Sequence, residues 1–270
     1  MDFSAFRDAL LAKGYADETA DAKIAHDIVL KAIADSGFHD NLTVKGGVVM
    51  SGITGLARRA TMDMDVDFLN YPLTNEAIRR FVSRLNRAAP CSIRIRGSIE
   101  TLRQHEYKGK RVHLALADGN GDTIETKVDI GVHTRDDVPQ TDFSFVVVSG
   151  DGTATLLVNK NEQILAEKLK SLLRFGAAST RFKDIFDIYY LLPRIDQSVF
   201  LEYLRLYVFD DPKMRENSLG DVLARLKRIF GNGRFMRGLS NPVVAWLDVR
   251  TEDVVSGILT FLEKPSGSAP

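Results

Sequence analysis

The sequence has little cysteine, no excess of either charge and no long apolar run. Its 270 residues include a single cysteine, Cys91, which excludes an internal disulfide framework. Lys plus Arg number 36 and Asp plus Glu number 36, so the formal net charge is zero. A general electrostatic attraction to nucleic acid is therefore not indicated, although charge segregated into a local basic groove stays open.

The same absences bear on where the protein works. No apolar run approaches the roughly 18 to 20 residues of a membrane span. The start, "MDFSAFRDALLAKG", lacks the basic region and apolar run of a signal peptide and predicts an amphipathic helix instead. One cysteine suits a reducing compartment. We therefore expect a soluble cytoplasmic protein that has no membrane partner.

Periodicity predicts helices first, then an α/β core, then a helical half. Residues 3–12 and 17–36 should be helical, "LTVKGG" reads as a strand followed by a helix, and Thr74 should cap a helix that ends before Pro90. From about 91 to 158, alternating β-branched stretches predict four or five strands, some paired as hairpins through "DGNGD". Beyond 158, Asn159 and Glu162 stand in capping-box positions. A helix should then run from Thr180 to Pro193, and more should follow near 196–207, 217–230 and 251–263.

The fold class that follows is α/β (α+β), a mixed sheet flanked by helices and followed by a helical domain. We expect residues 1–158 to hold the first helices and the core, and residues 159–263 the helical domain. The tail 264–270, of low complexity, should be disordered.

An acidic strand, "TMDMDVDF" at 61–68, is the first candidate for function. Alternation places Asp63, Asp65 and Asp67 on one face, and Met62, Met64, Val66 and Phe68 on the other, where they can pack into a core. Aspartates two apart lie about 7 Å apart along a strand, within reach of one divalent cation held between them. The alternative is an exposed face whose charges are solvated.

Two more sequence elements could form a site together with this strand. "KGG" at 45–47 stands between a predicted strand and a predicted helix, where backbone amides can bind phosphate, although a tight turn is the plainer explanation. In "TIETKVDIG", Asp129 lies on the polar face of another strand. If the two strands are neighbours, three carboxylates could bind two metal ions for phosphoryl transfer.

The combination "KGGVVM…RRATMDMDV…KVDIG…ILAEKLKSLLRF…TRFKDIFDIYYL" resembles the AbiEii/AbiGii family of toxin-associated nucleotidyltransferases. That family is similar to the DNA polymerase β-type nucleotidyltransferases, and the resemblance runs from about Lys45 to Leu192. It implies a nucleotidyltransferase-type core and the toxin of a toxin–antitoxin or phage-defence pair. It also implies a separately encoded antitoxin.

Matching the motifs gives the site residues that the resemblance implies. The metal ligands, for Mg²⁺ or Mn²⁺, would be Asp63, Asp65 and Asp129, and the catalytic residues these three together with Lys183. The nucleotide and phosphate groups would be bound by Lys45, Gly46, Gly47, Arg59, Thr61, Lys168 and Asp184. Glu167, Arg174 and Asp187 complete the last motif. The residue after the glycine pair, usually Ser or Thr in the family, is Val48 here, which puts phosphate binding through a hydroxyl in doubt.

Several of these residues have a plainer interpretation. Lys183, Asp184 and Asp187 share one edge of a helix and can form a structural ion-pair network instead of contacting substrate. Arg58 and Arg59 can bind phosphate or be solvated, and so can a set of arginines that could line a groove for RNA: Arg84, Arg87, Arg94 and Arg96. Asp67 lies about 13 Å from Asp63 along the strand. We expect it to be solvated or outside the metal pair, and its loss to cost less activity.

The sequence thus predicts a metal-dependent nucleotidyltransferase that moves a nucleoside monophosphate from an NTP to an acceptor hydroxyl, and the resemblance implies a tRNA as the acceptor. Two alternatives stay open. Val48 and the acid spacing would suit a non-catalytic NTP-binding regulator. An acidic cluster would also suit a metal-dependent nuclease, for which the "KGG" element has little use.

Overall fold

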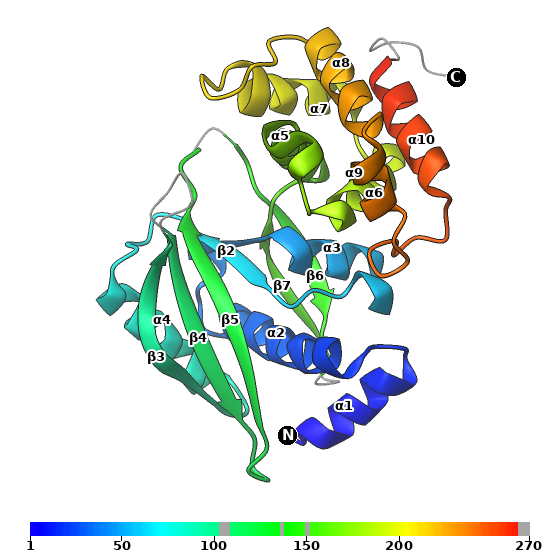
Figure 1. Ribbon diagram of the computed structural model, residues 1–270. Helices are drawn as coiled ribbons and strands as arrows, with labels where there is room; N and C mark the ends of the chain where they lie inside the picture. The colour runs from blue at the N-terminus through cyan, green and yellow to red at the C-terminus, as the bar shows by residue number, and fades with distance from the viewer. Residues whose placement is uncertain (103–108, 136–137, 149–151, 264–270) are drawn as a thin grey trace. The chain divides into compact units, whose positions relative to one another are not determined.

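A mixed sheet in the first half of the chain carries the acidic strand. The computed structural model describes residues 1–102, 109–135, 138–148 and 152–263. Within these residues the sheet has seven strands in the order β3-β4-β5-β2-β1-β7-β6 (Figure 1). The strands are β1 (Leu42–Lys45), β2 (Met64–Phe68), β3 (Ser92–Leu102), β4 (Gly109–Ala117), β5 (Thr123–Val132), β6 (Thr141–Val146) and β7 (Thr153–Val158).

Contacts divide the chain into two compact units, Met1–Asn159 and Lys160–Pro270. The α-helices of the first unit are α1 (Phe3–Ala12), α2 (Asp17–Asp35), α3 (Gly46–Thr54) and α4 (Asn75–Ala88). Those of the second are α5 (Asn161–Phe175), α6 (Phe182–Leu191), α7 (Gln197–Leu204), α8 (Leu219–Phe230), α9 (Gly233–Leu239) and α10 (Thr251–Glu263). The predicted class, a mixed sheet flanked by helices with a helical second part, is confirmed. The tail predicted to be disordered, residues 264–270, lies outside the described residues.

Strand β2 lies in the middle of the sheet, antiparallel to β1 and parallel to β5. The register pairs Val44 with Val66 and Val66 with Ile130, and all three side chains are buried. On the same face of β2, Phe68 packs edge-on against Phe81 of α4, with ring centroids 5.3 Å apart. Helix α4 also packs against β3, and α2 packs against β5 and β7 (Figure 1). Helices therefore cover the apolar face of the sheet.

Several local predictions are confirmed in the first unit. Helices α1 and α2 have the predicted bounds to within one residue. Strand β1 leads into α3 at Gly46. The hairpin between β4 and β5 turns at "DGNGD", where the Asp118 carboxylate accepts hydrogen bonds from the backbone N–H groups of Asn120 and Asp122.

The acidic strand starts later than predicted. β2 begins at Met64, so Asp63 precedes the strand and Met62 is 48% exposed. Met64, Val66 and Phe68 are fully buried, as the alternation predicts. Pairing with β5 begins at Met64 and pairing with β1 begins at Asp65, so Asp63 has no register partner in either strand. A run of alternating letters does not show where the partner strand ends.

Two predicted helix starts after residue 158 are wrong in detail, and one helix was not predicted. Helix α5 takes Lys160 as its N-cap, without a side-chain hydrogen bond, and Asn159 lies outside the helix. Helix α6 begins at Phe182 and not at Thr180. Helix α9 was not predicted, because its glycines resemble a turn, but the Asn232 side chain caps it by accepting from the N–H groups of Arg234 and Phe235.

No helix in the described part of the chain combines the length and the apolar character needed to cross a membrane.

The cap of α4 gives a first test. The Thr74 hydroxyl accepts a hydrogen bond of 3.1 Å from the N–H of Ala77, as predicted. We expect Thr74→Ala to lower the free energy of unfolding by about 1 kcal/mol, the usual cost of losing such a cap. Ser83→Ala, at an exposed position of the same helix, is the control. Chemical denaturation measures both, and an equal change in the two variants would contradict the assignment.

Candidate active site

Four charged residues form a row on the face of the sheet opposite the buried side chains of Met64, Val66 and Phe68. Lys45 of β1 pairs with Asp65 of β2, Asp65 pairs with Asp129 of β5, and Asp129 pairs with Arg111 of β4. Residues of one row on one face of a sheet have neighbouring side chains. The sheet therefore brings Asp65 and Asp129 side by side, as the sequence predicted on the condition that their strands are neighbours.

Asp65 lies against the N-terminus of α3. Gly46 opens this helix with φ +71°, a conformation that favours glycine, and a Cβ there would overlap Asp65 Oδ2. A Cβ on Gly47 would similarly overlap the Thr61 hydroxyl. The first N–H groups of a helix have no partner within it and carry partial positive charge. The glycine pair thus lets a helix N-terminus and an acidic side chain approach each other closely.

Asp129 is held by a bidentate ion pair. Arg111 Nε lies 2.7 Å from Oδ1 and Nη2 lies 2.7 Å from Oδ2. The hydrogen bonds that Arg111 donates to Asp129 raise the pKa of Arg111 above its ordinary value. Each carboxylate oxygen of Asp129 keeps a second lone pair in this arrangement, so it can still accept a proton or bind a cation.

Asp63 precedes β2 and has no register partner in this row. Its side chain is 58% exposed and lies 2.7 Å from Lys127 Nζ. Lys127 belongs to β5, two residues before Asp129. In this structure the first aspartate of the predicted metal pair is thus matched with a lysine, and its role as a ligand stays a prediction.

Asp67 is buried rather than solvated, which corrects one of the two expectations for it. The residue is 8% exposed, and its Oδ2 lies 2.7 Å from Lys45 Nζ. A pocket on this face is lined by Lys45, Asp65, Asp67, Leu102, Gly109, Asp129, Ile130 and Gly131. The pocket therefore holds Asp67 together with Asp65 and Asp129, whereas Asp63 is not among its lining residues.

The remaining predicted phosphate ligands of the first unit lie close to α3. Arg59 is 3% exposed in a short 3-10 helix (Ala57–Arg59), while Arg58 is exposed. The Thr61 hydroxyl packs on Gly47. Val48 is 4% exposed and lines a small internal cavity, so the residue after the glycine pair faces the interior. Backbone amides are then the groups that α3 can offer to phosphate.

The residues of the last motif belong to the second unit. Lys168 is 6% exposed and lies 2.6 Å from Asp184 and 2.8 Å from Asp187. Burial raises the pKa of Asp184, but the charges of Lys168 and Arg181 outweigh it, and the net pKa is lowered. This is the structural network that the sequence left open, although its lysine is Lys168. Lys183 is half-buried on α6.

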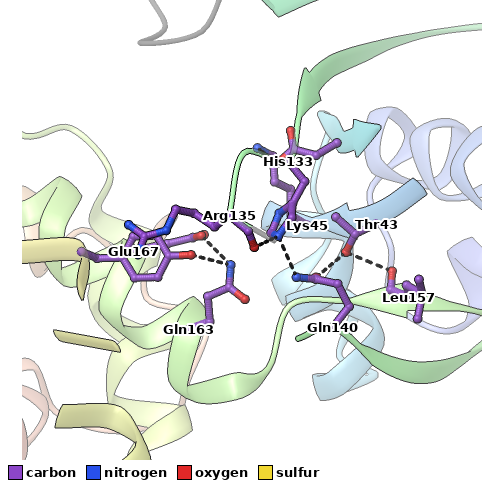
Figure 2. Close-up of polar contacts among 10 residues, drawn as sticks. Thr43, Lys45, His133, Arg135, Gln140, Leu157, Gln163 and Glu167 are labelled. Carbon is purple, nitrogen blue, oxygen red and sulfur yellow. Dashed lines mark hydrogen bonds and ion pairs between the residues drawn. The ribbon is translucent and has the colours of Figure 1, made fainter. Parts of the chain in front are cut away.

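Glu167, on the same helix as Lys168, is hydrogen-bonded to a residue of the second unit. It accepts a hydrogen bond of 2.9 Å from the amide of Gln163, and that amide also donates to the Tyr207 hydroxyl at 3.0 Å (Figure 2). The proposed phosphate roles of Lys168 and Asp184 and the catalytic role of Lys183 stay predictions.

Among the described residues, no three His, Cys, Asp or Glu side chains form a group that could hold a metal by themselves. The predicted trio is therefore assembled only in part: Asp65 and Asp129 are neighbours, and Asp63 is turned to Lys127.

Comparison with known proteins identifies the family. A family model described as nucleotidyl transferase AbiEii toxin, type IV TA system, matches residues 28–231. The chain belongs to the AbiEii family. The match includes the glycine pair, the acidic strand, Asp129 and the motif on α5 and α6, so the resemblance seen in the sequence is confirmed. The family is one of nucleotidyltransferase toxins of type IV toxin–antitoxin systems, which implies an antitoxin partner.

Other comparisons give less. The crystal structure of an antigenic nucleotidyltransferase-like protein from Paracoccidioides brasiliensis is 17% identical to this chain, with a TM-score of 0.42. The alignment covers 78% of this chain and 97% of that one. No curated protein matches the chain significantly.

Sequence reasoning did not identify Arg111 and did not expect Asp67 to be buried beside this candidate site. In "KRVHLALA", Arg111 alternates with Val112, Leu114 and Leu116 and so lies on a polar face, but its pairing with Asp129 depends on hairpin register. The expectation for Asp67 used only its distance from Asp63 along the strand. It did not consider that Lys45 of β1 could reach Asp67.

The close approach of Gly46 and Asp65 can be tested against a matched glycine. Gly46→Ala introduces a side chain at φ +71° and displaces Asp65; Gly55→Ala introduces one at φ +64°, at the other end of α3, where a Cβ meets nothing within 4 Å. Both should lose about 1 to 2 kcal/mol of stability from the left-handed backbone. Only Gly46→Ala should abolish nucleotide transfer, measured with labelled NTPs. Equal activity of the two variants would contradict a role of the close Gly46–Asp65 approach in nucleotide transfer.

The buried network of the second unit gives a stability test. Lys168→Met removes a partner of Asp187, which is fully buried, and should cost about 3 to 5 kcal/mol. Lys227→Met, which breaks an exposed pair with Glu263, should cost at most about 1 kcal/mol.

The same network predicts a pH dependence of stability. Since the pKa of Asp184 is lowered in the fold, the stabilisation from its ionised form is present at neutral pH and is lost as pH falls through that lowered pKa. Denaturant titrations between neutral and acid pH should show a weaker acid dependence in Lys168→Met than in the wild type.

Proposed function

We propose that this chain transfers a nucleoside monophosphate from an NTP to an acceptor hydroxyl and releases pyrophosphate, with Mg²⁺ or Mn²⁺ as cofactor. The observation that carries the proposal is the meeting of three groups: the N-terminus of α3 at Gly46, the carboxylate of Asp65 beside it, and Asp129 in the next strand. Phosphate binding and acidic chemistry are thus available at one place, and membership of the AbiEii family supports their use in nucleotide transfer.

The residues present fit a divalent cation. Mg²⁺ in such sites is usually held by one or two carboxylates together with substrate phosphates, so Asp65 and Asp129 suffice without a closed protein cage. They line one pocket, where Asp67 Oδ1 is buried and has no hydrogen-bond partner among the residues that the structure describes. Asp63 is the further ligand that the family motif implies. When bound, the cation would neutralise charge on the phosphates and make the acceptor hydroxyl more acidic.

The chain's own groups account for the rest of the reaction. The N–H groups at Gly46 and Gly47 would bind phosphate oxygens, and Thr61, which packs on Gly47, and the buried Arg59 would support that binding. The acceptor oxygen attacks the α-phosphorus, the bond to the α–β bridging oxygen breaks, and pyrophosphate leaves. Asp129, oriented by Arg111, would take the proton of the acceptor hydroxyl.

In this proposal, charged residues of the second unit also act on the phosphates. Lys183 of α6 would neutralise phosphate charge in the transition state, for which a flexible ammonium is suited. Lys168 and Asp184 would support phosphate binding, with Lys168 acting from a buried position. The acceptor that the family resemblance favours is a tRNA, and the proposed context is a toxin of a phage-defence pair that a separately encoded antitoxin counters.

A transfer assay tests the function. Wild type incubated with labelled NTPs, Mg²⁺ and total tRNA should label the RNA. Asp65→Asn and Asp129→Asn should each lose on the order of 10² to 10³-fold of the rate, the effect of removing one electrostatic group from a transition state. Asp40→Asn, at a side chain that is 92% exposed, is the matched control and should keep full activity.

The outcomes separate the candidate functions. Tight NTP binding by calorimetry without transfer to any acceptor would favour a non-catalytic regulator. RNA cleavage in the absence of NTP would favour a nuclease. Transfer that is equal in wild type and Asp65→Asn would refute the proposed site even if labelling occurs.

A further inference from the structure

The lysine that precedes the glycine pair bonds an aspartate that the family motif does not include. In the strand register Lys45 lies opposite Asp65. Its ammonium nevertheless reaches Asp67, two register pairs further along the strand, with Nζ and Oδ2 2.7 Å apart. The Lys45 side chain is 33% exposed, and that of Asp67 is 12% exposed. The pair is thus anchored in the sheet at the aspartate and open to the pocket at the lysine.

The surroundings of Asp67 make Lys45 its ion-pair partner. Thr43 lies opposite Asp67 in the register, but its hydroxyl is 2.8 Å from Gln140 Oε1 and 3.3 Å from the carbonyl oxygen of Leu157 (Figure 2). The second oxygen, Asp67 Oδ1, is buried without a hydrogen-bond partner in the described residues. A carboxylate in such a place is costly to bury unless a cation compensates it.

A glycine on the neighbouring strand makes room for this carboxylate. Gly131 of β5 pairs with Asp67, and a Cβ on Gly131 would overlap Asp67 Oδ1. The same Cβ would lie 3.8 Å from Lys45 Nζ. Gly131 therefore lets the aspartate lie flat against β5 and leaves its other oxygen turned to the lysine.

Lys45 is placed where a triphosphate would meet it. It is the N-cap residue of α3, it precedes Gly46 directly, and it lines the pocket together with Asp65 and Asp129. A flexible ammonium here can bind phosphate oxygens, and its ion pair with Asp67 fixes where it lies.

We propose that Asp67 is a positioning residue that holds the Lys45 ammonium at the N-terminus of α3 for the β- and γ-phosphates of the NTP, and that Gly131 gives Asp67 the space to do so. The inference rests on the proposed nucleotidyl transfer. It assigns roles to Asp67 and Gly131, and it explains why a third aspartate follows the two of the family motif.

The test separates nucleotide binding from turnover. Asp67→Asn keeps the shape of the side chain and removes its charge. We expect the KM for NTP to rise about 10- to 100-fold, the effect of losing one hydrogen bond to a charged group, while kcat changes by a few-fold at most. Lys45→Met should raise KM by the same factor. The double variant should be no worse than Lys45→Met alone, because Asp67 acts through Lys45.

Two further variants keep the test independent of one substitution. Gly131→Ala should reproduce the rise in KM by displacing Asp67, whereas Gly119→Ala, at a hairpin position where a Cβ meets nothing within 4 Å, should not. Asp142→Asn, at an exposed carboxylate on β6, is the charge-matched control. Thermal unfolding is recorded for each variant, and kinetics are measured well below every midpoint.

Calorimetry with inorganic pyrophosphate distinguishes failure of this inference from failure of the proposed function. If the wild type binds pyrophosphate and Asp67→Asn binds it about 10-fold or more weakly, the positioning role holds even should no acceptor be labelled. A lowered midpoint of unfolding with unchanged KM and unchanged pyrophosphate affinity would show a purely structural pair and overturn the inference. Additive effects of Lys45→Met and Asp67→Asn on KM would overturn it as well.

Discussion

The register in which β2 lies between β1 and β5 decides which side chains meet on each face of the sheet. In that register Met64, Val66 and Phe68 are buried beneath the helices, and Asp65 meets Lys45 and Asp129 on the other face. Side chains alternate with a period of two, so a slip of one residue would bury the aspartates and expose the apolar residues. Full burial of a large apolar side chain is worth about 1.5 to 3 kcal/mol, and three such residues on β2 make the slipped register unfavourable. The apolar face thus fixes the geometry of the charged one.

The same arrangement explains how a sheet tolerates several aspartates in succession. Three of the acidic residues have a cation from another strand within 2.7 Å: Asp63 has Lys127, Asp67 has Lys45 and Asp129 has Arg111. Because each cation comes from a neighbouring strand, charge is balanced locally before any ligand binds. Lys45 and Arg111 flank the central pair Asp65–Asp129 from opposite sides of the row. The protein's formal net charge of zero does not reveal this local pairing of acidic and basic side chains.

Sequence reasoning predicted the parts of the site that depend on local pattern. The strand–glycine–helix element at Gly46, the alternation of Met64, Val66 and Phe68, and the cap at Thr74 all follow from residues close in the chain. Features set by strand pairing were not accessible, since an alternating sequence does not specify its neighbour. The start of β2 at Met64, the burial of Asp67 and the Arg111–Asp129 ion pair are of this kind. In the second unit, Lys168 lies on α5 and Asp184 on α6, so their ion pair depends on how these two helices pack.

The parallel pairing of β2 with β5 has a consequence for how the protein is made. Asp65 is synthesised early, but its neighbour Asp129 follows only after α4, β3 and β4 have been completed. Contacts between residues distant in the chain form slowly, because the intervening loop must be closed before they are rewarded. A nascent chain that has not reached Asp129 cannot assemble the carboxylate pair, whatever local structure it has gained. Any truncated product that ends before β5 therefore lacks the Asp65–Asp129 pair.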